Sequence, residues 1–435
     1  MPVRLLPRVI VVATLHWATT TRLCLALAEG GFEVTALAPD GHALHSLPDV
    51  VAERLGRTRA QALRKISATV DLDLPDLIVP ADDPAIDLLH TLYTRAIRGR
   101  GSDPRRMADL IESSVGMPSA FTFAHEKSRL IELAAKEGLA VPTTAPVADI
   151  YALRELLGTT RFPAVLKRDH SCNGRGVRVV QDEFEAERAY RDLQARSSAL
   201  AALKGAARKL DIAPLERLYH RGPAIALQQY IAGRPANRAV ACHRGTVLAG
   251  LSVEALCTDG AHGPATVVRV IDSPDMAEAV RRLVRRLGLS GFVGFDFVLE
   301  HSTGRPFLIE MNGRPTQICH LAFDAASDMI GALAAALGAV PRPRAMLAPE
   351  VSTIALFPQE CWRDPTSSFL QLAYHDVPCR SPDFIAAYRE RVPFEPVDWL
   401  RALREHLQWA QRLVSRPVAG VTATLAGPRA SRPAS

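Results

Sequence analysis

The segment at 291–315, GFVGFDFVLEHSTGRPFLIEMNGRP, constrains the fold of this chain more than any other stretch. Two runs of alternating apolar and polar residues flank the turn HSTGR, which predicts a β-hairpin. Asp296 lies in the first run, and Glu310 and Asn312, two residues apart, share one face of the second. A carboxylate among the apolar residues of a strand needs a partner. We therefore expect these three side chains to meet on one face.

Such a cluster of carboxylate and amide oxygens is typical of a Mg²⁺ site. Arg314 follows two residues after Asn312, where a guanidinium can stabilise charge on a transferring phosphoryl group. The alternative is a pair of surface carboxylates on an edge hairpin, which would have no metal and no chemistry.

A second hairpin, with glycines at its tip, is predicted in FPAVLKRDHSCNGRGVRVV at 162–180. Its GxG, Gly174 and Gly176, follows Lys167 and precedes a strand-like run, so it matches neither the Walker loop nor the dinucleotide fingerprint. The segment is either an ordinary glycine-containing hairpin or a different nucleotide-binding device. In the second case Lys167 contacts phosphates as a point charge and the loop covers them with backbone N–H groups.

The segment LQQYIAG at 227–233 is an extended stretch that can bind the edge of an adenine. We expect free backbone groups at Gln229 and Ile231 to make the contact, with the Gln228 amide assisting.

The N-terminal part predicts an open parallel sheet. Residues 9–38 give a strand, a polar loop, an amphipathic helix and a second strand, and 75–93 repeats the strand–loop–helix unit. Ligands of such sheets bind at the carboxyl ends of the strands. Four loop residues are therefore either substrate contacts or helix caps: His16, Thr19, Thr20 and Asp82.

The remaining segments predict mixed structure. A helix ended by Gly138 leads to an edge strand, and three strand-like runs at 224–256 predict one antiparallel meander. Residues 191–222 predict a helix with a mobile connection. The Pro-rich tail predicts a helix near 396–414 and disorder over the last fifteen residues.

Composition excludes several classes of protein. At 435 residues the chain exceeds one hydrophobic core, so two to three domains are expected. The net charge of +6 comes from scattered arginines, and the cluster at 281–288 lacks the aromatic residues that stack bases, so we expect a solvated helix face rather than a nucleic-acid patch. Seven cysteines without a CxxC pair fit a reducing compartment, and no stretch is long enough for a membrane span, which together predict a cytoplasmic protein.

Taken in order, FPAVLK, NGRGVRVV, QQYIAG, FDF and EMNGR closely resemble the motifs of the ATP-grasp superfamily, over roughly residues 5–335. The resemblance implies an α/β and α+β fold: a Rossmann-like N-terminal (pre-ATP-grasp) domain, a two-subdomain ATP-grasp fold and a C-terminal extension. The implied boundaries are 1–120 for the first domain, 121–340 for the ATP-grasp domain (small lid subdomain about 140–230, large subdomain about 231–340) and 341–435 for the extension.

The resemblance also implies roles for individual residues. Lys127, in HEKSRL, resembles the first ATP-binding lysine, although Glu126 stands where an aspartate is usual. Pro235 and Ala236 occupy the neighbourhood where many members have a ribose contact, which is a departure from the family pattern. The other implied ATP contacts are Lys167, Gly174, Gly176, Gln228, Gln229 and Ile231; the implied Mg²⁺ ligands are Asp296, Glu310 and Asn312; and Arg314 and Lys167 are the implied catalytic residues.

The activity implied is an ATP-dependent carboxylate–amine or carboxylate–thiol ligase that uses ATP and Mg²⁺, with Mn²⁺ as an alternative ion. Its partners would be ATP, a small-molecule carboxylate and a nucleophile, without nucleic acid or membrane, and a homodimer is allowed. Two alternatives stay open: a nucleotide-binding regulatory protein of the same fold without turnover, and an oxidoreductase built on the first domain. The second lacks the glycines of the dinucleotide fingerprint.

Overall fold

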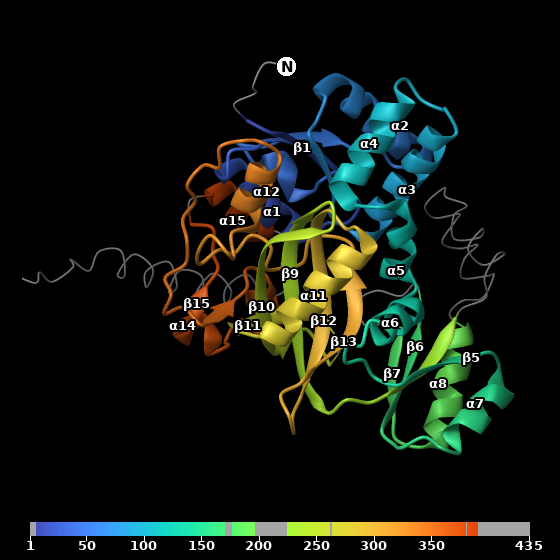
Figure 1. Ribbon diagram of the computed structural model, residues 1–435. Helices are drawn as coiled ribbons and strands as arrows, with labels where there is room; N and C mark the ends of the chain where they lie inside the picture. Colours follow the sequence, from blue (N-terminus) through green and yellow to red (C-terminus); the bar gives the residue numbers. More distant parts are fainter. Residues whose placement is uncertain (1–5, 170–175, 196–223, 262, 380, 390–435) are drawn as a thin grey trace, which may run out of the picture.

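A computed structural model describes residues 6–169, 176–195, 224–261, 263–379 and 381–389 (Figure 1). The described chain forms three β-sheets with helices packed against them, which confirms the predicted α/β and α+β class. Within these ranges, no helix has the length and apolar character needed to cross a lipid bilayer.

The N-terminal sheet is four-stranded and parallel, with strand order β3-β2-β1-β4. Alternate residues of β1 are buried on opposite faces, Val9 and Val11 in one core and Ile10 and Val12 in another, as expected for a parallel sheet covered by helices on both sides. Its elements are β1 (Arg8–Val12), α1 (Ala18–Glu29), β2 (Glu33–Ala38), η1 (Ala43–Ser46), β3 (Val51–Arg54), α2 (Arg59–Asp73), β4 (Leu77–Pro80), α3 (Asp83–Ile97) and α4 (Pro104–Val115).

Three short helices lead out of this sheet. They are η2 (Pro118–Ala120), α5 (Phe121–His125) and α6 (Lys127–Lys136), and α6 ends before Gly138 as predicted. Helix α6 contacts both of the other sheets, through β13 and β5.

The second sheet is also four-stranded, with order β5-β8-β6-β7 and all pairs antiparallel. Two helices cover one face and share its apolar core. Its elements are β5 (Thr144–Val147), α7 (Ile150–Leu157), β6 (Ala164–Arg168), β7 (Val177–Val180), α8 (Glu183–Ala195) and β8 (Ile225–Gln229). The predicted edge strand and hairpin are both present.

The third sheet has seven strands, in the order β13-β12-β9-β10-β11-β14-β15. Helix α11 begins at the N-cap Ser273 and ends at Gly288, whose φ of +60° favours glycine, and it packs on one face of the sheet. The main elements are β9 (Gly233–His243), β10 (Thr246–Thr258), β11 (Ala265–Val270), α11 (Pro274–Leu287), β12 (Gly291–Glu300), β13 (Pro306–Asn312) and α12 (Met329–Ala336).

The prediction of one meander at 224–256 was wrong. Strands β9 and β10 pair as expected, but β8 pairs with β5 and β6 in the second sheet. The connection at 230–232 therefore joins two sheets rather than two neighbouring strands.

The described part of the C-terminal extension completes the third sheet. Strand β14 pairs with β11, β15 pairs with β14, and α15 contacts η1 of the N-terminal part. Its elements are β14 (Thr353–Ala355), α13 (Gln359–Arg363), α14 (Phe369–Leu372), β15 (Tyr374–His375) and α15 (Pro382–Arg389). Of the segment predicted at 191–222, residues 191–195 belong to α8 and the rest lies outside the described residues, as do the predicted helix near 396–414 and the tail. The domain boundaries stay a proposal, which the division of strands among the sheets supports.

Candidate active site

The hairpin of β12 and β13 brings its polar residues together as the sequence predicted. Asp296 pairs in register with Glu310, and Gly294 pairs with Asn312. The Asn312 amide donates to Asp296 Oδ2 at 2.8 Å. A third side chain, Asn237 on β9, donates to Asp296 Oδ1 at 2.6 Å. Both carboxylate oxygens of Asp296 are therefore held by amide groups of the two neighbouring strands.

Two lysines lie beside these carboxylates. Lys127, at the start of α6, is 7% exposed and its Nζ lies 2.9 Å from Glu310 Oε1. Lys167 comes from β6 in the second sheet. Burial lowers the pKa of Lys167 to about 8; the Glu310 and Asp296 carboxylates act against this shift, and the Lys127 ammonium adds to it. Two sheets and one helix thus place two cations and two carboxylates within electrostatic reach of one another.

The nearby lysines do not offset the cost of ionising Asp296. Burial raises the pKa of Asp296, and the Glu310 charge raises it further, while the two amide hydrogen bonds and Arg314 act against the rise. A buried carboxylate whose pKa is raised by a neighbouring carboxylate is stabilised by a cation that the two groups share. In the described ranges, no group of three His, Cys, Asp or Glu side chains could hold a metal. The donor set that fits Mg²⁺ is therefore two carboxylates and the Asn312 amide oxygen.

Arg314 lies between this cluster and the N-terminal sheet. Its Nε donates to Asp83 Oδ1 at 2.9 Å, and its guanidinium carbon lies 4.8 Å from the centroid of the Trp17 ring. Its Nη2 donates to Asn312 Oδ1 at 3.3 Å. The sequence identified Arg314 but missed Asp83 and Trp17.

The loop that carries Arg314 lies directly on β12 because of a glycine. A Cβ added at Gly294 would stand 2.1 Å from Thr316 Cγ2, so a larger residue would displace the loop. The Thr316 hydroxyl in turn donates to Asn237 Oδ1 at 3.3 Å. The sequence signal for Asn237 was its place in GRPANRAV, where it is a polar residue in a strand of alternating character.

The predicted adenine contacts are only partly available. The backbone N–H of Gln229 donates to the Thr143 carbonyl at 2.8 Å, and the Gln228 amide donates to Thr144 Oγ1 at 2.9 Å. The expectation that the Gln229 N–H is free was wrong, because β8 is a central strand paired on both sides. Ile231 is buried in the connection between the two sheets.

The glycine hairpin is described only at its base. The Gly176 carbonyl accepts a hydrogen bond from the Arg168 N–H at 2.9 Å, which closes the pair of β6 and β7. Gly174 lies outside the described residues, with the rest of 170–175.

The loops of the N-terminal sheet separate into caps and exposed groups. Asp82 accepts hydrogen bonds from the backbone N–H groups of Thr14, Leu15 and Ala85, so the capping interpretation is correct for this residue. Burial raises the pKa of Asp82, and these hydrogen bonds lower it. The His16 ring is stacked on His42, with 5.5 Å between their centroids.

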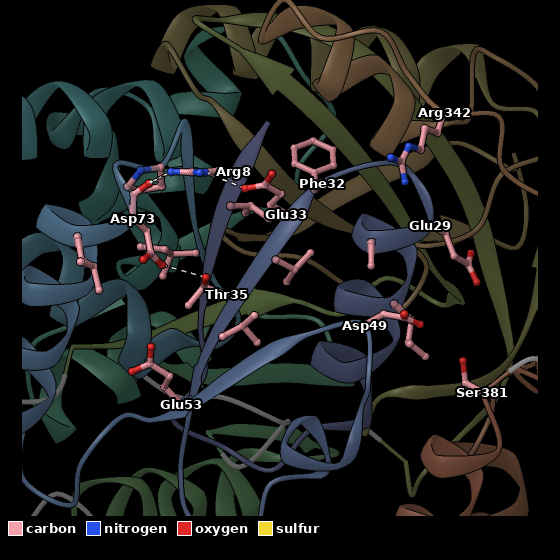
Figure 2. A pocket seen from close by; sticks show the side chains of 18 residues that line it. Arg8, Glu29, Phe32, Glu33, Thr35, Asp49, Glu53, Asp73, Arg342 and Ser381 are labelled. Atoms are coloured by element: carbon pink, nitrogen blue, oxygen red, sulfur yellow. Dashed lines mark hydrogen bonds and ion pairs between the residues drawn. The ribbon is translucent and has the colours of Figure 1, made fainter. Parts of the chain in front are cut away.

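A cavity of about 870 Å³ lies elsewhere, at the amino end of the N-terminal sheet (Figure 2). Arg8 crosses it from the first position of β1, with its Nε 2.8 Å from Glu33 Oε2, and Thr35 donates to Asp73 at 2.9 Å. None of the predicted site residues lines this cavity. We therefore place the candidate site at the β12–β13 hairpin.

The comparisons with known proteins match a segment that includes the β12–β13 hairpin. Residues 208–317 match the model of the ATP-grasp domain. The chain is 28% identical over 148 residues to mitochondrial pyruvate carboxylase of Homo sapiens, a match that covers 30% of this chain and 11% of that protein. The same values hold for the enzyme of Mus musculus.

Solved structures show the same fold. An L-amino acid ligase from Bacillus licheniformis matches with a TM-score of 0.55 and 18% identity, covering 80% of each chain. The biotin carboxylase domain of the Hydrogenobacter thermophilus 2-oxoglutarate carboxylase, in complex with MgADP, ADP and bicarbonate, matches with a TM-score of 0.54 and 16% identity, covering 80% of this chain and 72% of that one. Residues 208–317 are thus similar to the ATP-grasp domain, and the chain shares the fold of an amino acid ligase and of a biotin carboxylase domain.

Proposed function

We propose that this protein is an ATP-dependent ligase that activates a substrate carboxylate as an acyl phosphate. The observation that carries the proposal is the in-register pair of Asp296 and Glu310, two carboxylates that face each other between two lysines and an arginine. Burial raises the pKa of Asp296, with Glu310 adding to the rise, and burial lowers the pKa of Lys167; perturbed titratable groups that cluster in this way are typical of functional sites. Such a site gains from a bound cation and from phosphates.

Asp296, Glu310 and Asn312 are the residues that would hold Mg²⁺, or Mn²⁺ in its place. The ion would neutralise charge on the nucleotide phosphates. Lys127 and Lys167 would contact phosphate oxygens, and Arg314 would stabilise the charge that develops on the transferred phosphoryl group. We propose the connection at 229–231 as the adenine contact, with Ile231 and the backbone beside it in place of the paired Gln229 N–H.

In the proposed reaction, a substrate carboxylate oxygen attacks the terminal phosphorus of ATP, and the bond to the bridging oxygen of ADP breaks. An amine or thiol then attacks the acyl carbon, phosphate leaves, and the nucleophile loses its proton. The similar structures, an amino acid ligase and a biotin carboxylase domain, support ATP-dependent ligation in general. We propose a small-molecule carboxylate and an amine as the substrates, with a thiol as the alternative nucleophile.

The test is ADP formation with Mg²⁺ across a panel of carboxylates and amines. Glu310→Gln should lower turnover about 100-fold or more, because it removes a charged ligand of the metal and the partner of Lys127. Glu300→Gln is the matched control, since Glu300 lies at the far end of β12 and contacts Thr303. ATP binding without ADP release for any pair would favour the regulatory alternative, and full activity of Glu310→Gln would contradict the metal assignment.

A further inference from the structure

Two side chains of the N-terminal sheet reach into the candidate phosphate site. Asp83 is the first residue of α3, and Trp17 immediately precedes α1. Both lie at the carboxyl ends of parallel strands, β4 and β1, and both contact Arg314. Neither caps its own helix, because Asp82 caps α3 and the Trp17 side chain makes no cap hydrogen bond. Their contacts with Arg314 are therefore not a by-product of helix capping.

The contacts fix two sides of the guanidinium and leave a third facing the metal cluster. Asp83 accepts from Nε at 2.9 Å, and the Trp17 ring covers one face. The Nη2 group then points to Asn312 Oδ1, at 3.3 Å, beside Asp296. The Arg314 side chain is only 13% exposed and that of Asp83 is 30% exposed, so the pair is partly shielded from solvent.

We propose that Asp83 and Trp17 are positioning residues that hold Arg314 toward the terminal phosphate of the nucleotide. This inference rests on the proposed function, because it assigns to Arg314 a phosphate contact. An arginine has many side-chain rotamers, and ordering it before the ligand binds removes an entropic cost from binding and from catalysis. The N-terminal domain would thereby contribute to phosphate recognition without itself contacting the nucleotide.

A charge-only argument predicts the opposite sign for Asp83. A carboxylate next to Arg314 weakens the attraction of that guanidinium for any anion, so its removal would strengthen phosphate binding. If positioning dominates, removal weakens binding. The direction of the effect therefore distinguishes the two explanations.

The experiment compares the affinities of the protein for ADP and for the β,γ-imido analogue of ATP, each with Mg²⁺, by calorimetry. Their ratio reports what the terminal phosphate adds. Asp83→Ala should lower the preference for the triphosphate about tenfold, as expected for a charge-assisted hydrogen bond, while ADP affinity stays the same. Trp17→Ala should lower it about threefold. Asp83→Asn and Trp17→Phe should each keep most of the preference, because an acceptor or a ring remains.

Three further variants complete the design. Arg314→Ala should abolish the preference, and Asp83→Ala should then add nothing to it. Asp109→Asn removes one exposed charge from α4 and should change neither affinity. If Asp83→Ala does not fold, the Trp17 pair decides the outcome.

An unchanged or increased triphosphate preference in Asp83→Ala and Trp17→Ala, with ADP still bound, would overturn the positioning role alone. A wild-type protein that binds neither nucleotide would overturn the proposed function and this inference with it. A fall in melting temperature with an unchanged affinity ratio would show that the contacts serve only to join the domains.

Discussion

Two clusters of buried charge in this molecule shift the pKa of their central aspartate in opposite directions. In the candidate site, Asp296 faces Glu310, and burial together with that neighbour raises its pKa. In the second cluster, Asp376 of the C-terminal extension pairs with Arg22 of α1 and lies 2.7 Å from His320 Nε2. Burial raises the pKa of Asp376, but Arg22 and His320 outweigh it and the net shift is downward.

The difference distinguishes a structural ion pair from the proposed functional site. In the folded chain the Asp376 carboxylate is paired with both Arg22 and His320, and it joins the extension to α1 of the N-terminal part. The Asp296 cluster would be completed by a ligand that carries a cation and phosphates. A buried carboxylate whose charged form the protein leaves destabilised indicates function more strongly than one that is paired with cations.

The largest effect is expected from removing the carboxylate of Asp376. Asp376→Ala leaves Arg22 and His320 without their carboxylate, and should lower the free energy of unfolding by about 3–5 kcal/mol. Denaturant unfolding measures this change. Asp296→Asn should leave stability unchanged or raise it, because it removes one of two repelling carboxylates. An equal loss in both variants would contradict the comparison.

The free energy of unfolding at acid pH should depend on Asp376 but not on Asp296. Because the folded-state pKa of Asp376 is lowered, its contribution is present above the unfolded carboxyl pKa, about 3.9, and is lost as pH falls through the folded value. Asp376→Asn should therefore flatten the acid limb of an unfolding series. Asp296→Asn should not flatten it, since the pKa of that residue shifts in the other direction.

Lys167 should impose an alkaline limit on nucleotide binding. Burial lowers its pKa to about 8, so the ammonium loses its proton, and its attraction for phosphate, as pH rises through that value. ADP affinity should fall with a midpoint near pH 8, and Lys167→Arg should remove the fall because a guanidinium stays charged. Over the pH range between 8 and the ordinary lysine value, the free energy of unfolding should rise, because the unfolded chain still binds the proton. Lys136→Arg, at an exposed lysine on α6, is the control, and a midpoint unaffected by Lys167→Arg would contradict this assignment.

The smallest effect is expected on α11. Arg281 pairs with Glu278 on the same helix, and both side chains are more than half exposed. Arg281→Gln should leave melting temperature and nucleotide affinity within experimental error, because exposed pairs contribute little. A salt-dependent loss of nucleic-acid binding in this variant would instead identify a basic interface.

The sequence predicted the candidate site well where the geometry is local. The alternation of the two strands and the position of the turn set the register of the β12–β13 hairpin. The sequence therefore predicted that Asp296 and Glu310 lie on the same face. Lys167 was identified from the glycine hairpin that it precedes, and Lys127 from the family resemblance. Nothing in either segment indicates that a helix and a strand of another sheet meet at the carboxylates.

Longer-range features could not be predicted for the same reason. Which sheet β8 joins depends on β5, whose Thr144 is 84 residues away from its Gln228 partner. Arg22 and Asp376 are separated by 354 residues, and their pairing leaves no local pattern. The sequence analysis considered Asp82 but not its neighbour Asp83. Asp82 caps α3, whereas Asp83 binds Arg314, and no local pattern distinguishes the two carboxylates.

The most direct test of the central claim is a calorimetric titration of ADP, with and without Mg²⁺, into the wild-type protein, Asp296→Asn and Glu310→Gln, with Glu300→Gln as the control. If Asp296 and Glu310 bind the cation, Mg²⁺ should increase the affinity of the wild type and the control for ADP. This increase in affinity should disappear in the two site variants. A gain of the same size in all four proteins would contradict the assignment of Asp296 and Glu310 as the metal site.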